Sequence, residues 1–143
     1  MIGKNNVLNI RASRSFTWLG QTGETRGFCN FEGIEMCRRA GLYLLMRSYR
    51  RANVVTLADV IKRWAPPTEN ETGKYVDFVA KWSGLKGGFV LRFVSDFASV
   101  LAAMEMVEIG VPASKRAEYY ATAKDSYIYL SNHFNVKPYE SKG

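Results

Sequence analysis

The chain has 143 residues, a formal charge of +7 and nearly half of its residues apolar. This composition indicates one globular domain and excludes a disordered chain, while charges within the longest apolar runs exclude a membrane-spanning helix. A single histidine and two cysteines exclude a disulfide framework and a histidine-ligated metal, so we expect no metal. No organic cofactor is implied by the sequence. The positive charge predicts an anionic partner.

Residues 1–33 are rich in Asn, Gly, Ser and Thr and contain only short apolar pieces. This pattern predicts irregular structure with short strands or a hairpin. The N-terminal residues contain no continuous apolar stretch, so we expect no signal peptide.

Helical periodicity begins at Ile34, with apolar and small residues on one face and arginines largely elsewhere. The cluster RSYRR at 47–51 could contact phosphates, as in small basic nucleic-acid-binding proteins. However, arginines on the outer face of an amphipathic helix are usually solvated, and neither a recognition helix nor an aromatic RNA-binding motif is present. We therefore expect no specific binding of nucleic acid.

Thr56 is suited to cap a second helix, which runs to about Trp64 and is stopped by Pro66 and Pro67. The stretch after this helix, PPTENET, has two interpretations. It is either a rigid connection between helices or the stiff wall of a cleft whose polar side chains face a ligand.

A third helix is expected over 72–82, ending at Gly84. The fourth helix is predicted from apolar residues at three- and four-residue spacing, which form one stripe: Val90, Phe93, Phe97, Val100, Leu101, Met104 and Val107. Pro112 suits the first turn of a fifth helix that carries Tyr120 and Tyr127. The fold class is therefore mainly α (α+β).

Glu108 lies at the end of the fourth predicted helix, close to the line of Phe97, Leu101 and Met104. Partial burial and the carboxyl end of the helix dipole should both favour the protonated carboxyl group, which a general acid requires. Alternatively, Glu108 pairs with an arginine or reaches solvent at the helix end. Glu105 lies towards the edge of the stripe and is expected to be solvated.

Several short motifs occur in order along the chain: NNVLNIR at 5–11, W-x-G-Q at 18–21, F-x-x-F at 28–31, R-A at 39–40, LL-x-x-x-Y at 44–49 and T-x-x-x-V-I-x-R-W-A-P-P-x-E-N-x-T-x-x-Y-x-x-x-V at 56–79. This series resembles a family of small phage and prophage proteins, often described as virion structural proteins, with the pattern NNNPGNIR and WAPPxENxTxxY. Val7 and Leu8 depart from the family's Pro-Gly, and Cys37 and Arg38 depart from its Gly-Ile.

That family in turn resembles the lysozyme superfamily, especially bacterial glucosaminidases and lytic transglycosylases. In those enzymes the catalytic glutamate ends a helix, often as Glu-Ser-Gly, ahead of an Asn-rich segment. Glu108-Ile109-Gly110 resembles this element but follows the Asn-rich segment at 5–11. The resemblance therefore implies a lysozyme-like helical domain over 1–134 that is circularly permuted, followed by a loosely ordered tail over 135–143.

The resemblance implies a monomeric peptidoglycan hydrolase that cleaves the glycan strand between N-acetylmuramic acid and N-acetylglucosamine, with Glu108 as general acid. Attack by water calls for a second carboxylate, with Glu24 as the candidate and Glu32, Glu35 and Glu69 as weaker alternatives, whereas attack by the sugar's own 6-hydroxyl needs none. The expected substrate-binding residues are Asn9, Trp18, Glu69, Asn70 and Tyr75, and Trp64 is another stacking candidate.

A non-catalytic phage virion or envelope-binding protein on the same scaffold is the alternative function. In both cases we expect the partners to be bacterial peptidoglycan and anionic envelope polymers. Without a signal peptide, the protein would reach them from a phage particle, or from the host cytoplasm with later access to the cell wall.

Overall fold

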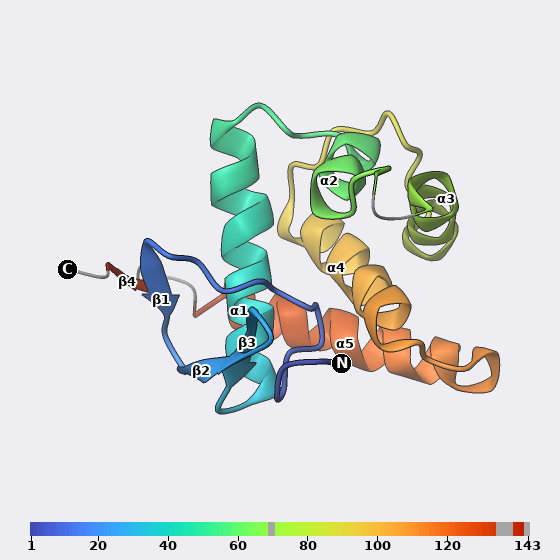
Figure 1. Ribbon diagram of the computed structural model, residues 1–143. Coiled ribbons are helices and arrows are strands. Elements are labelled where there is room, and N and C mark those ends of the chain that lie inside the picture. The colour runs from blue at the N-terminus through green and yellow to red at the C-terminus, as the bar shows by residue number, and fades with distance from the viewer. Residues whose placement is uncertain (69–70, 134–138, 142–143) are drawn as a thin grey trace.

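The structure is a computed structural model that describes residues 1–68, 71–133 and 139–141. It is mainly α-helical with short strands, which confirms the expected α+β class. The strands and the N-terminal segment lie on one side of the molecule, and α2 and α3 lie on the other, as Figure 1 shows. Helices α1, α4 and α5 connect the two sides.

The N-terminal third contains three short strands, as expected: β1 (Phe16–Trp18), β2 (Gln21–Thr25) and β3 (Phe28–Phe31). Strands β2 and β3 form an antiparallel hairpin. Strand β1 pairs instead with β4 (Tyr139–Ser141), so these three residues of the tail are not the loose segment that the sequence predicted. Residues 135–138 and 142–143 of the predicted tail lie outside the described residues.

Helix α1 (Ile34–Tyr43) begins where predicted and continues as π-helical turns, η1 (Leu44–Tyr49). It packs closely on the N-terminal segment, because a Cβ atom at Gly41 would lie 2.5 Å from Cδ1 of Leu8. A larger residue at this position would force the side chain of Leu8 to shift.

Helices α2 (Leu57–Trp64) and α3 (Thr72–Ser83) have the predicted ends. The hydroxyl of Thr56 accepts a 3.1 Å hydrogen bond from the amide of Asp59, which caps α2. Gly84 ends α3 with φ of +74°, a left-handed conformation that glycine adopts without strain.

Helix α4 (Val94–Ile109) is the central helix of the protein, and it packs between α3 and α5 (Arg116–Ser131). Every residue from Asp96 to Met106 is buried, so the helix does not have the single apolar stripe that its periodicity predicted. Phe93, which was placed on that stripe, precedes the helix as its N-cap residue and is 70% exposed. A short 3₁₀ turn, η2 (Ala113–Lys115), connects α4 to α5.

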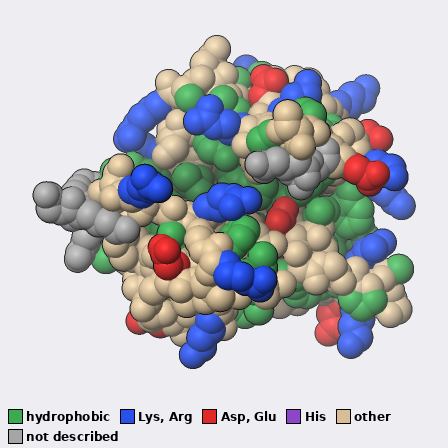
Figure 2. All heavy atoms as spheres, viewed as in Figure 1, with side chains coloured by type: hydrophobic (Ala, Val, Ile, Leu, Met, Phe, Trp, Pro, Cys, Tyr) green, Lys and Arg blue, Asp and Glu red, His purple; other side chains and the backbone are tan. Residues whose placement is uncertain are grey.

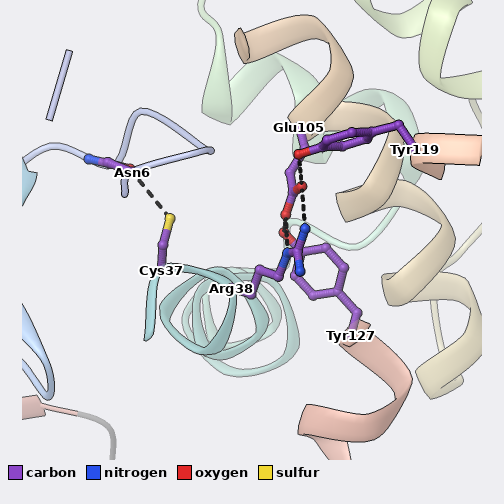
Figure 3. Close-up of polar contacts among 6 residues, drawn as sticks. All are labelled: Asn6, Cys37, Arg38, Glu105, Tyr119 and Tyr127. Atoms are coloured by element: carbon purple, nitrogen blue, oxygen red, sulfur yellow. Dashed lines mark hydrogen bonds and ion pairs between the residues drawn. The ribbon is translucent and has the colours of Figure 1, made fainter. Parts of the chain in front are cut away.

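The prediction that Glu105 is solvated is wrong, since its side chain is completely buried. Its carboxylate accepts hydrogen bonds from Arg38 on α1 and from the hydroxyls of Tyr119 and Tyr127 on α5, at 2.7 to 3.0 Å (Figure 3). A carboxylate with this many partners and no exposed surface joins three helices and is inaccessible to a substrate.

No helix in the described part of the chain is long and apolar enough to cross a lipid bilayer.

Candidate functional site

The Asn-rich segment before β1 is a compact loop organised around Asn6. The buried amide of Asn6 donates to the carbonyls of Ile10 and Cys29 and accepts from the amide of Ile10, at 2.8 to 2.9 Å. Asn5 and Asn9 take left-handed conformations with φ of +57° and +52°, which asparagine tolerates better than most residues. The loop thereby holds the side chain of Asn9 towards the end of α4.

Asn9 and Tyr75 both contact Glu108. The amide nitrogen of Asn9 donates to Oε1 of Glu108 at 3.1 Å and to its main-chain carbonyl at 3.3 Å. The hydroxyl of Tyr75, on α3, donates to Oε2 at 2.8 Å. Three segments that are distant in sequence therefore hold one half-buried carboxyl group at the end of the central helix.

The amide oxygen of Asn9 is buried and accepts no hydrogen bond from the described residues. Rotation of this amide by half a turn would present the oxygen to a protonated Glu108. Asn9 can therefore partner the carboxyl group both when it carries a proton and when it does not.

Tyr75 remains a hydrogen-bond donor over a wide pH range. Burial, the negative charge of Glu108 and the hydrogen bond between the two side chains raise the pKa of Tyr75 well above its ordinary value. The phenol is therefore protonated at neutral pH and into the alkaline range.

Glu108 borders a cavity of about 300 Å³, the Glu108 hollow, which is lined by Ile2, Asn9, Arg11, Phe28, Trp64, Ala65 and Glu108. A second cavity of about 200 Å³, the tryptophan hollow, is lined by Asn9, Ile10, Arg11, Phe16, Trp18, Leu44, Tyr49 and Trp64. The two hollows share Asn9, Arg11 and Trp64, so they adjoin. They combine aromatic side chains with one cation and one carboxyl group.

A third and larger cavity of about 530 Å³, the Arg116 pocket, is bordered by Tyr75, whose hydroxyl contacts Glu108. It is lined by Glu71, Lys74, Tyr75, Phe78, Met106, Val107, Gly110 and Arg116. Tyr75 therefore contacts the Glu108 carboxyl group and also lines this pocket, whereas Glu108 itself lines the Glu108 hollow and neither of the other two cavities. Lys and Arg side chains are spread over the face shown in Figure 2, with apolar side chains exposed between them.

The predicted site residues differ in where they lie. Asn9, Tyr75 and Glu108 are in contact, as described above, whereas Glu24 is exposed on β2 and lines none of these three cavities. Trp18 borders the tryptophan hollow but is only 3% exposed and packs edge-on against Phe16, so it is mainly a core residue.

The remaining candidates contribute less to the described site. Glu69 and Asn70 lie outside the described residues. Glu32 and Glu35 are exposed near the start of α1 and line none of the three cavities. Thr72, at the start of α3, donates a 2.6 Å hydrogen bond to the carbonyl of Ala65, which closes the loop after the two prolines beside the Glu108 hollow.

Sequence reasoning missed Arg11 and Phe28 as site residues. The guanidinium of Arg11 lies 4.7 Å from the ring centroid of Phe28, and both side chains line the Glu108 hollow. A backbone bridge between the same two residues sets this arrangement. Because 17 positions separate Arg11 from Phe28, no local sequence pattern indicates their contact. Arg11 belongs to the NNVLNIR motif and Phe28 to the F-x-x-F motif.

No three His, Cys, Asp or Glu side chains of the described residues are grouped as a metal site would require. Comparison with protein-family models and with curated proteins finds no match to this chain. The arrangement around Glu108 is therefore interpreted from its chemistry.

Proposed function

We propose that the protein cleaves the glycan strand of bacterial peptidoglycan, with Glu108 as the general acid. The observation that carries this proposal is the contact of the Glu108 carboxyl group with Asn9 and Tyr75 at the edge of an aromatic hollow. A glycosidase needs a carboxyl group positioned to protonate the oxygen that leaves the sugar. The half-buried end of a rigid helix meets this need.

The hollows beside Glu108 suit a sugar chain. Pyranose rings have apolar faces that pack on aromatic side chains, and Trp64, Tyr49 and Phe28 are half-buried and line the two hollows. Arg11 supplies hydrogen-bond donors for the carbonyl oxygens of the N-acetyl and lactyl amide groups of the glycan strand. The bond between N-acetylmuramic acid and N-acetylglucosamine is the proposed bond, as the resemblance implies.

A route with one carboxylate fits this site better than a route with two. Among the described residues that line the two hollows, Glu108 is the one carboxylate. Glu108 would protonate the oxygen that leaves N-acetylmuramic acid. The 6-hydroxyl of that N-acetylmuramic acid would then attack its own oxocarbenium-like anomeric carbon. The proton lost from that hydroxyl returns to Glu108, and the product is an anhydro sugar formed without water.

The resemblance to phage and prophage proteins and to the lysozyme superfamily agrees with this proposal. Under it, the domain is a circularly permuted lysozyme-like fold, in which the glutamate-bearing helix follows the Asn-rich segment instead of preceding it. The net charge of +7 would assist attachment to anionic wall polymers. Delivery in a phage particle or late access from the host cytoplasm belongs to the same proposal.

Incubation with purified sacculi, followed by centrifugation, tests the function. Soluble muropeptide fragments in the supernatant are the expected result. Protein that sediments with intact sacculi and releases no fragments would instead identify a non-catalytic envelope-binding protein. Mass spectrometry of the fragments distinguishes the one-carboxylate route, because its anhydro product is lighter than the hydrolysis product by one water molecule.

A further inference from the structure

The Arg116 pocket has a composition that a neutral sugar does not require. Its floor is apolar, with Phe78 from α3 and Met106 and Val107 from α4, and Arg116 stands at its rim. A pocket of about 530 Å³ is large enough for a short peptide. Apolar walls with a single oriented cation favour a ligand that carries both methyl groups and a carboxylate.

Arg116 is oriented by the protein before any ligand binds. Its Nε donates a 3.0 Å hydrogen bond to the carbonyl of Val111, and its guanidinium lies 5.3 Å from the ring centroid of Phe78. Among the described residues, no carboxylate forms an ion pair with Arg116, whereas Lys74 at the same rim is paired with Glu71 at 3.3 Å. The terminal nitrogens of a fixed guanidinium match the two oxygens of a carboxylate.

We propose that the Arg116 pocket binds the peptide stem of peptidoglycan, with Arg116 holding a stem carboxylate and the apolar floor receiving alanine methyl groups. This inference depends on the proposed function, because it assigns the pocket to the same substrate. The stem is joined to N-acetylmuramic acid through its lactyl group, beside the bond to be cleaved. A pocket that shares Tyr75 with the acid is placed to receive it.

The direct test is the affinity of the Glu108→Gln variant for two soluble fragments, measured by isothermal titration calorimetry. One fragment is a disaccharide with its peptide stem, and the other is the same disaccharide after an amidase has removed the stem. The stem should increase affinity roughly tenfold, the scale of one hydrogen-bonded charge pair. Adding Arg116→Gln should remove this difference, and Arg116→Lys, which keeps the charge without the planar fork, should remove most of it.

Lys115→Gln is the matched control, because Lys115 precedes Arg116, is exposed and lines a different cavity. It should leave the preference for the stem unchanged. Equal affinity for the two fragments, no binding of either, or a preference that survives Arg116→Gln would overturn the assignment. So would Arg116-dependent binding of poly(glycerol phosphate) in place of the peptide-bearing fragment.

Cleavage of sacculi by the wild-type protein is scored separately. Cleavage without a preference for the stem overturns the pocket assignment alone. Stem binding that depends on Arg116, without any cleavage, supports the assignment and overturns the catalytic proposal. The two failures are therefore distinguishable.

Discussion

Arg38 and Glu105 form an ion pair with two hydrogen bonds inside the protein, of 2.7 and 3.0 Å, although 67 positions separate them in the sequence. Tyr119 and Tyr127 donate to the same carboxylate. Glu105 is thus a structural carboxylate one turn before Glu108, and the two glutamates of α4 have different tasks. Glu105 binds the helices together, and Glu108 lines the Glu108 hollow.

Replacement of Glu105 should destabilise the fold. Glu105→Gln removes the charge that compensates Arg38, and breaking a buried pair in this way costs about 3 kcal/mol or more of unfolding free energy. Urea denaturation measures the change. Glu118→Gln, at an exposed position on α5, should change the unfolding free energy by less than about 0.5 kcal/mol. Similar small changes in both variants would contradict the structural role of Glu105.

Tyr75→Phe should lower the rate of glycan cleavage roughly tenfold, since it removes the hydrogen bond that orients Glu108. The rate is measured by fragment release from sacculi. Tyr129→Phe, which removes an exposed hydroxyl, should leave the rate unchanged. An unchanged rate in Tyr75→Phe would show that the hydrogen bond to Glu108 does not contribute to cleavage.

Alkaline pH should unfold the protein. Burial and the charge of Glu105 raise the pKa of Tyr127 well above its ordinary value of 10.0. Below pH 10 the phenol is protonated in both states, but above it the unfolded chain loses a proton that the folded chain keeps, so stability falls. The thermal midpoint should therefore decrease from about pH 10 upward, and more gently in Tyr127→Phe. A wild-type midpoint that stays constant to pH 11 would refute this.

The thiol of Cys37 should be unreactive in the folded protein. Burial raises its pKa to about 12, although hydrogen bonds from the Leu8 and Val7 backbone oppose the shift, and the thiol donates to Oδ1 of Asn6 at 3.4 Å. Since the thiolate is the nucleophile, iodoacetamide at pH 8 should leave Cys37 unmodified until the protein is unfolded in urea. Mass spectrometry of the peptide containing Cys37 checks this. Rapid modification of the native protein would contradict the burial.

Much of the helical structure could be predicted because its signals are local. Thr56 marks the start of α2, and Gly84 marks the end of α3, each through chemistry that acts within a few residues. The resemblance assigned Asn9, Tyr75 and Glu108 to one site. Their contact itself could not be predicted, because no local pattern reports a contact between residues 9 and 108.

The environment of α4 could not be predicted from its periodicity. Small residues do not contribute to an apolar periodicity, but they allow α3 and α5 to pack closely on α4. The buried small residues of α4 include Ala98, Ser99, Ala102 and Ala103. The burial of Glu105 likewise depends on partners from α1 and α5 that lie far away in the chain. Such long-range packing decides which glutamate is buried and which one faces a cavity.

The initial rate of fragment release from purified sacculi by the wild-type protein and by Glu108→Gln tests the general acid most directly. The variant keeps the shape of the side chain but has no proton to give. It should be slower by roughly 10²–10⁴-fold, while Glu118→Gln should keep the full rate. Equal rates for the wild type and Glu108→Gln would contradict the assignment of Glu108 as the acid.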